Sequence, residues 1–174
     1  AQAAAVTAAR ADAVLVGATD GPGVRALWQA LHAAAPRTLL FAASSLATPA
    51  FVAAAGPAGA MTRVTSPELD PGRYPPKAQV LLKRYRLVFG TAPTAYTLYG
   101  YEAMQSILDA IRAAGSHGGD RASVVRAYFN LGLRDSPIGR YSVTATGDTT
   151  LGNMAGYRIG PDGRLRLDRM LSAG

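Results

Sequence analysis

The sequence predicts an α/β fold: an open parallel sheet with flanking helices, and late strands that are partly antiparallel. Short apolar runs of strand length alternate with helix-forming segments in the first 65 residues. Helical spacing then dominates as far as residue 131, and strand patterns return from residue 138 onward. Strands that alternate with helices are typical of parallel sheets, because a parallel pair needs a crossover connection. At 174 residues, of which 49% are hydrophobic, the chain is long enough to bury a substantial core.

The first part of the chain supplies the predicted parallel strands. Apolar runs predict strands at 13–17, 38–43 and 60–65. Composition and apolar spacing predict helices at 2–11, 24–34 and 49–55. The run "AVLVG", which forms the first strand, has no polar position, and this favours a strand buried on both faces of its sheet. Thr19 or Asp20 is the expected N-cap of the second helix, with Pro22 in its first turn.

A proline-rich stretch then interrupts this alternation. Residues 66–76 contain four prolines in eleven positions, which predicts a connector between two bodies. Amphipathic spacing predicts the helices that follow, at 77–89, 96–114 and 122–131. The expected final strands are 140–146, 154–159 and 164–169, with a tight turn at 160–163.

Composition narrows the classes of function. Cysteine is absent, which excludes disulfide bonds, thiol catalysis and zinc–thiolate sites. No apolar run approaches the roughly 18 residues that a membrane-spanning helix needs, so no direct membrane insertion is expected of this segment. The net charge of +7 arises from 18 basic and 11 acidic residues. The basic side chains lie on a helix face and an outer strand without interleaved aromatic residues, which favours solvated surfaces over nucleic-acid binding.

Small polar residues follow two neighbouring strands of the predicted sheet. Thr19 and Asp20 come after the first strand, and Ser44 and Ser45 come after the second. Open α/β sheets place their ligands at the carboxyl ends of parallel strands, so these four side chains should meet at one edge. The sequence therefore predicts a ligand-binding site made of Thr19, Asp20, Ser44 and Ser45. Helix capping accounts for the first pair without any ligand.

Motifs for catalysis and cofactor binding are missing around these residues. The glycines of "GATDGPG" match neither the phosphate-loop pattern nor the dinucleotide-binding pattern. Ser44 and Ser45 lie outside a GxSxG elbow, and the two histidines, His32 and His117, are expected at the surface. The sequence also lacks the clustered His and carboxylate residues of a metal site. We therefore expect no catalytic residues, no metal and no cofactor.

Four segments carry a resemblance to a known family. The first two are "ADAVLVGATDGPGVRALWQAL" and "TLLFAASSLATPAF", each a predicted strand followed by a loop. The other two are the predicted helix "FGTAPTAYTLYGYEAMQSILDAIRAAGS" and the late stretch "SPIGRYSVTATGDTTLGNMAGYRIGPDGRL". In this order they resemble a strand that ends in a loop over the ligand, the next strand and loop, a helix of the other lobe and the closing stretch of the type I periplasmic binding proteins of the leucine/isoleucine/valine-binding group. The resemblance spans almost the whole chain.

The resemblance implies a two-lobed protein. Such proteins have two α/β lobes that are joined by three hinge crossings and close over a small molecule. By this resemblance, residues 1–66 and 156–174 form the ligand-binding lobe, and residues 73–153 form the carboxyl-terminal part of the other lobe. Residues 67–72 and 154–155 are the expected hinge crossings. The first half of that other lobe has no counterpart, which implies a fragment whose apolar helix stripe at 96–114 is either left exposed or covered in an oligomer.

The resemblance also implies a function. It points to a non-catalytic, extracytoplasmic solute-binding protein, periplasmic or at the cell surface, that delivers a small molecule to the permease of an ABC importer. In relatives selective for aliphatic amino acids, the loop at Ser44 offers a carboxylate to the ligand ammonium. Ser44 is neutral here, which leaves Asp20 to supply that charge and leaves other small polar or aromatic acids open as ligands. The alternatives are a sensory ligand-binding domain of the same fold and a small α/β hydrolase.

Overall fold

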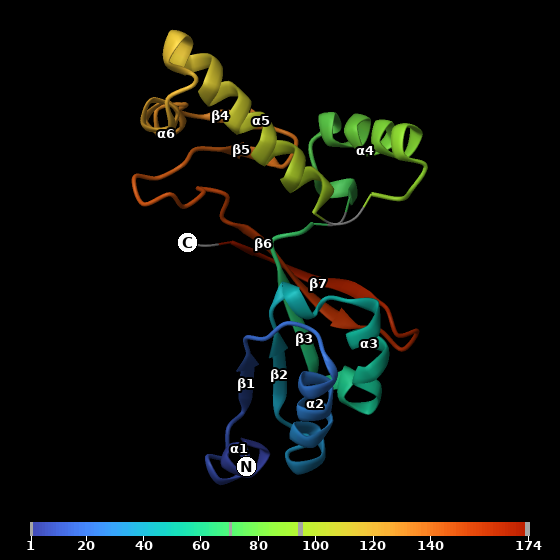
Figure 1. The fold of residues 1–174 in the computed structure, drawn as a ribbon. Coiled ribbons are helices and arrows are strands. Elements are labelled where there is room, and N and C mark those ends of the chain that lie inside the picture. Colours follow the sequence, from blue (N-terminus) through green and yellow to red (C-terminus); the bar gives the residue numbers. More distant parts are fainter. Residues whose placement is uncertain (1, 70, 94–95, 173–174) are drawn as a thin grey trace. The chain divides into compact units, whose positions relative to one another are not determined.

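The computed structural model describes residues 2–69, 71–93 and 96–172 (Figure 1). The chain divides into two compact units. Unit 1 comprises Ala1–Pro67 and Asn153–Gly174, and unit 2 comprises Glu68–Gly152. No helix among the described residues is long and apolar enough to cross a membrane.

Unit 1 is built on a five-stranded sheet. Its strands, in spatial order, are β1 (Ala13–Val16), β2 (Leu39–Ala42), β3 (Thr62–Ser66), β6 (Asn153–Ile159) and β7 (Leu165–Ser172). The first three are parallel to one another, whereas β6 and β7 are added antiparallel. This confirms the predicted open sheet with partly antiparallel late strands. The third strand begins two residues later than predicted, because residues 56–61 form a 3₁₀ turn.

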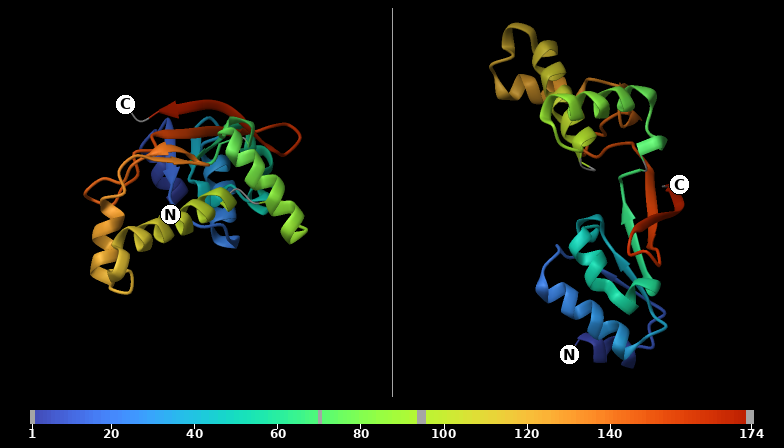
Figure 2. Two further views of the ribbon diagram at one scale, coloured as in Figure 1. Left: turned by 90° about the horizontal axis from the view of Figure 1, so that it is seen from above. Right: turned by 90° about the vertical axis from the view of Figure 1, so that its right-hand side faces the viewer.

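The helices of unit 1 are α1 (Gln2–Ala8), α2 (Pro22–Ala34) and α3 (Pro49–Ala55), with a 3₁₀ turn at Ser44–Leu46. Trp28 of α2 and Phe51 of α3 pack edge to face, with ring centroids 5.0 Å apart. They lie in one cluster with Leu40 and Val64, so both helices cover the same face of the sheet (Figure 2). The indole N–H of Trp28 donates to the hydroxyl of Thr62 at 2.8 Å, which satisfies its polar atom inside the core.

The opposite face of the sheet is not covered in the same way. Leu15 of β1 is 72% exposed, although its neighbours Val14 and Val16 pack against the core. The prediction that the first strand is buried on both faces is therefore wrong for this chain. The physical reason is that side chains alternate along a strand, and the α2–α3 layer lies against only one of the two faces.

Unit 2 consists of helices and one small hairpin. Its elements are α4 (Pro76–Phe89), α5 (Thr97–Ala114), α6 (Arg121–Phe129), the 3₁₀ turns Pro71–Arg73 and Gly115–His117, β4 (Arg134–Ser136) and β5 (Gly139–Tyr141). The three predicted helices are confirmed, but the predicted strand 140–146 ends at Tyr141, and β4 was not predicted. Thr144 and Asp148 explain the early end of the strand. The backbone N–H of Thr144 donates to the carbonyl oxygen of Asp148, and the backbone N–H of Asp148 donates to the Thr144 hydroxyl, which closes a local loop instead of pairing with a neighbouring strand.

Unit 2 buries little apolar surface. Its cluster of buried residues comprises Tyr74, Ala78 and Leu98. Large apolar side chains of α5 remain 38–57% exposed, among them Met104, Ile107 and Ile111. The apolar stripe at 96–114 is thus exposed in this single chain. For α4, the amphipathic spacing predicts that Val80, Leu81, Tyr85 and either Val88 or Phe89 point inward. This is wrong for Val80, Val88 and Phe89, which are 63–66% exposed.

Candidate ligand-binding site

The candidate site lies in unit 1, where β1 and β2 end. Val16 and Ala42 are register partners at the carboxyl ends of these parallel strands, so the loops that follow them share one edge of the sheet. The hydroxyl of Ser45, in the second loop, donates to the carbonyl oxygen of Ala18 in the first loop at 2.7 Å. The structure therefore brings the two predicted loops together at one edge. Thr19 and Ser45 are exposed there, and Ser44 is partly exposed.

Asp20 is the most constrained residue of this edge. Its side chain is only 12% exposed. Arg25 donates two hydrogen bonds to it, from Nε to Oδ1 at 2.7 Å and from Nη2 to Oδ2 at 2.8 Å. The hydroxyl of Thr48 donates to Oδ2 at 2.5 Å. The hydrogen bonds from Arg25 and then from Thr48 lower the pKa of Asp20 to about 2, so the carboxylate is ionised at neutral pH.

Helix capping at this edge differs from the prediction. The N-cap of α2 is Gly21, whose backbone is extended, and no side chain caps the helix; Pro22 is in the first turn as expected. The prediction of Thr19 or Asp20 as N-cap is wrong, because the Asp20 carboxylate binds the side chain of Arg25 further along the same helix. Thr48 instead caps α3, with its hydroxyl accepting from the backbone N–H of Phe51 at 3.0 Å.

The chemistry of the edge suits recognition by hydrogen bonds. The proton of the Ser45 hydroxyl is given to a backbone carbonyl, so this serine is not activated as a nucleophile by a histidine. Among the residues that the structure describes, no group of three or more His, Cys, Asp or Glu side chains could hold a metal ion. The edge offers a ligand small hydroxyl groups on two loops, and hydrogen bonds hold these two loops together.

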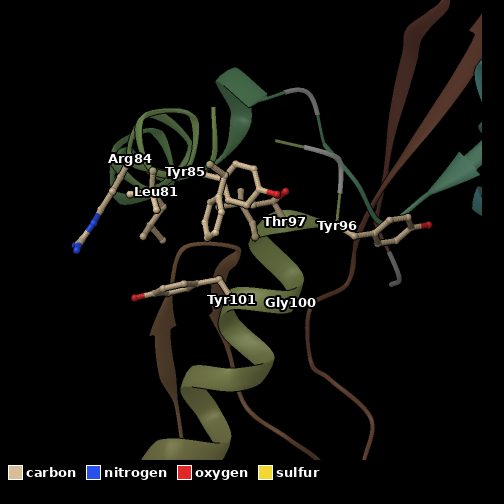
Figure 3. A pocket seen from close by; sticks show the side chains of 10 residues that line it. Leu81, Arg84, Tyr85, Tyr96, Thr97, Gly100 and Tyr101 are labelled. Atoms are coloured by element: carbon tan, nitrogen blue, oxygen red, sulfur yellow. The ribbon is translucent and has the colours of Figure 1, made fainter. Parts of the chain in front are cut away.

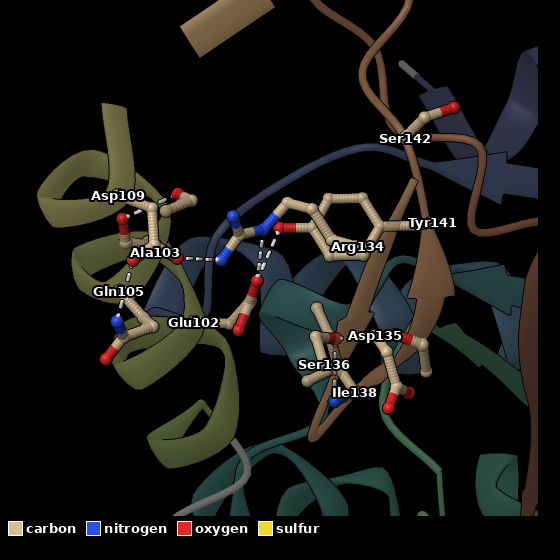
Figure 4. Close-up of polar contacts among 12 residues, drawn as sticks. Glu102, Ala103, Gln105, Asp109, Arg134, Asp135, Ser136, Ile138, Tyr141 and Ser142 are labelled. Carbon is tan, nitrogen blue, oxygen red and sulfur yellow. Dashed lines mark hydrogen bonds and ion pairs between the residues drawn. The ribbon is translucent and has the colours of Figure 1, made fainter. Parts of the chain in front are cut away.

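A second polar cluster lies within unit 2, between α5 and the β4–β5 hairpin (Figure 4). Arg134 donates from Nε to Glu102 at 2.8 Å and from Nη2 to Asp109 at 3.0 Å. The phenol of Tyr141 donates to Glu102 at 2.9 Å. The side chains of Glu102 and Arg134 are 3% and 12% exposed. Two antiparallel strands and a helix are thus joined by one buried ionic cluster.

The pKa shifts of this cluster indicate a structural role. Burial lowers the pKa of Arg134, but hydrogen bonds to Glu102 and Asp109 outweigh burial and raise that pKa overall. Burial and the hydrogen bond to Glu102 raise the pKa of Tyr141 to about 12. The hydrogen bond from Arg134 lowers the pKa of Asp109. Arg134, Tyr141 and Asp109 therefore each keep one protonation state near neutral pH, unlike a general acid or base.

Sequence reasoning missed this cluster. Glu102 and Asp109 lie seven residues apart, which places both on one face of a helix, and that spacing is a signal for a shared partner. Their partner Arg134 is 32 residues further along the chain from Glu102 and belongs to a strand that the sequence did not predict. No local pattern identifies such a contact, because the tertiary packing of the hairpin on α5 creates it.

Unit 2 also carries an apolar groove of about 680 Å³ between α4 and α5 (Figure 3). Leu81, Tyr85 and Tyr101 line it, and the rings of Tyr85 and Phe89 lie 4.7 Å apart. Arg84 and Thr97 add polar side chains to this lining. The strand-end edge of unit 1 remains the candidate site because it lies at the carboxyl ends of two parallel strands, where open α/β sheets place their ligands.

Comparisons with known proteins agree with this architecture. A family model described as "Periplasmic binding protein" matches residues 1–164. The "Leu/Ile/Val-binding protein homolog 2" of Brucella abortus (strain 2308) is 37% identical over 97 residues, which are 55% of this chain and 25% of that protein.

Solved structures share the fold at low sequence identity. The leucine-binding protein LivK of Thermotoga maritima superposes with a TM-score of 0.78 and 19% identity, over 98% of this chain and 47% of that one. A solute-binding protein of R. palustris in complex with benzoate superposes with a TM-score of 0.67 and 20% identity, over 98% of this chain and 46% of that one. The chain thus spans about half the length of these two structures. Since the family model covers nearly the whole sequence and the fold agrees, the chain belongs to the type I periplasmic binding proteins, in the leucine/isoleucine/valine-binding family.

Proposed function

We propose that the protein is the solute-binding component of an ABC importer, that it works outside the cytoplasm, and that it is not an enzyme. Its membership of the periplasmic binding protein family is the observation that carries this proposal. The relatives whose names state a role are described as binding proteins for leucine, isoleucine and valine or for solutes. The partners would be a small-molecule ligand and the permease of the importer.

Ligand capture would work by closure of two lobes. Residues 1–66 and 156–174 would form one lobe, residues 73–153 part of the other, and residues 67–72 and 154–155 two of the hinge crossings. The division of the chain into two compact units, with the chain passing between them after Pro67 and after Gly152, supports this proposal. A ligand drives such closure only to the extent that it contacts the closed state better than the open state.

The proposed ligand is an amino acid or another small polar or aromatic acid, bound at the edge formed by Thr19, Asp20, Ser44 and Ser45. The hydroxyls of Thr19 and Ser44 would donate to the ligand carboxylate, and hydrogen bonds to a charged acceptor are stronger than those between neutral groups. The Ser45 hydroxyl gives its proton to the carbonyl of Ala18, so it would only accept from a ligand. Two named relatives support this class, since one is a leucine-binding protein and the other was solved with benzoate.

The test uses the protein as its native host produces it. Its intact mass and cellular fraction would be measured first, and the purified protein would then be titrated with leucine and with benzoate by calorimetry. Binding of either compound by an extracytoplasmic protein supports the proposal. Retention in the cytoplasm would contradict the importer role. A product fused to a kinase or to a DNA-binding segment would instead favour the sensory alternative.

A further inference from the structure

The Asp20 carboxylate lies between the starts of two helices of unit 1. Gly21, the N-cap of α2, directly follows Asp20, and Arg25 holds both carboxylate oxygens from within that helix. Thr48, the N-cap of α3, donates its hydroxyl proton to Oδ2 of the same carboxylate. One partly buried negative charge therefore links the loop after β1 to the beginning of the helix that follows β2.

Thr48 transmits this link to the backbone of α3. A threonine hydroxyl has one proton, and Thr48 gives that proton to Asp20. This orientation directs an oxygen lone pair to the backbone N–H of Phe51, from which Thr48 accepts at 3.0 Å. The bond between Ser45 and the carbonyl of Ala18 joins the same two loops at a second point, 2.7 Å long. The geometry of both loops thus depends on Asp20 and its partners.

A direct contact between Asp20 and a ligand ammonium fits these contacts less well. Arg25 already supplies a full positive charge to both oxygens, and the side chain is only 12% exposed. A ligand ammonium would have to share the carboxylate with the guanidinium of Arg25, and the two like charges would repel each other. The pKa of about 2 agrees with a carboxylate whose hydrogen bonds come from within the protein.

We propose that Asp20 is a positioning residue of the ligand site: its carboxylate fixes the two strand-end loops through Arg25 and Thr48 and does not contact the ligand. The expected effect of Asp20 on ligand binding rests on the proposed function. The hydrogen-bonded link between the two loops lies within unit 1 and does not depend on that function. Ligand contacts at this edge then come from the hydroxyl groups and backbone of the two loops. Because Asp20 does not contact the ligand, the site does not require a positively charged group on it.

The first test measures the link without any ligand. Amide hydrogen exchange is compared between the wild-type protein and Asp20→Asn, with Asp162→Asn as the matched control, because Asp162 pairs with Arg166 at 3.0 Å elsewhere in unit 1. We expect exchange at the Phe51 amide to become about tenfold faster in Asp20→Asn, the scale of losing one hydrogen bond to a charged group. The Asp162→Asn control should leave it unchanged. Unchanged exchange at Phe51 in Asp20→Asn would overturn the proposal.

A second pair of variants separates the link from a general loss of folding. Thr48→Val removes the hydroxyl at nearly constant size, and Thr48→Ser keeps it. Thr48→Val should reproduce the fast exchange at Phe51, and Thr48→Ser should restore the wild-type rate. Equal rates in the two variants would contradict a role for the hydroxyl.

The third test distinguishes positioning from direct contact. Leucine and 4-methylpentanoate, which is leucine without its ammonium, are titrated into the full protein and into Asp20→Asn. Positioning predicts that the variant weakens both ligands by a similar factor, about tenfold. A loss confined to leucine would show direct contact with the ammonium and overturn the proposal. A wild-type protein that binds neither of these compounds nor benzoate would count against the proposed function, and the exchange data would still decide whether the link exists.

Discussion

Unit 1 and unit 2 use different means to hold their elements together. In unit 1, eight buried apolar residues of two helices, the sheet and their connections form one cluster. In the described part of unit 2, the corresponding cluster has three residues, and a buried ionic cluster joins α5 to the hairpin. The helices of both units have apolar faces, but α2 and α3 face a five-stranded sheet, whereas α5 faces the two-stranded β4–β5 hairpin. An amphipathic helix therefore yields a core only where the fold provides a second apolar layer.

The largest effect should follow from damage to the core of unit 1. Phe51→Ala should lower the free energy of unfolding by about 3 to 5 kcal/mol, because it leaves a cavity beside Trp28. Trp28 is the sole tryptophan of the chain, so its fluorescence during urea unfolding reports on unit 1. The matched truncation in unit 2 is Met104→Ala, at a side chain that is 57% exposed, and it should change stability by less than about 1 kcal/mol. Equal losses in the two variants would contradict the difference between the units.

Breaking the ionic cluster should be the main way to destabilise unit 2. Arg134→Met leaves the Glu102 carboxylate buried without its ion partner, at a cost of about 3 kcal/mol, the lower end of the range for buried pairs. The loss should appear in the helical signal by circular dichroism, with little change in the fluorescence transition of Trp28. Arg112→Met is the control, since Arg112 is 66% exposed and pairs with Asp109 at the surface. An Arg134→Met variant with unchanged stability would show that the ionic cluster does not hold the hairpin on α5.

Acid should affect unit 1 through Asp20. Its pKa falls from the ordinary 3.8 to about 2 in the folded protein, so its contribution to stability is complete above about pH 4 and is lost as the pH falls towards 2. Unfolding midpoints followed by Trp28 fluorescence between pH 5 and pH 2 should decline, and the decline should be shallower in Asp20→Asn. Parallel curves for the two proteins would mean that Asp20 does not have a lowered pKa.

The smallest effect on stability is expected on the exposed apolar surface of α4. Leu87 is 77% exposed, so Leu87→Ser should change the free energy of unfolding by no more than about 0.5 kcal/mol. The same substitution should reduce the binding of a hydrophobic dye such as ANS, because it removes accessible apolar surface. Lys83→Ser, at an exposed polar position of the same helix, is the control and should leave dye binding unchanged. A large loss of stability in Leu87→Ser would show that this surface is covered.

The candidate site was predictable in its place but not in its contacts. Thr19, Asp20, Ser44 and Ser45 follow adjacent parallel strands, and the structure brings their two loops together at one edge. Their role in binding a ligand stays a prediction. The contacts of Arg25 and Thr48 with Asp20 were not predicted from the sequence. Asp20 and Thr48 are 28 residues apart, and their hydrogen bond depends on how the first turn of α3 packs against the loop after β1.

The sequence by itself determined the local order of the elements. Apolar runs located β1, β2 and β3 to within two residues at each end, and amphipathic spacing located α4, α5 and α6, because these patterns reflect interactions between near neighbours along the chain. Only the tertiary structure decided which apolar faces are covered, that β5 ends at Tyr141, and how Glu102 meets Arg134. These outcomes depend on contacts between residues far apart in the sequence, and such contacts exist only once the layers have packed.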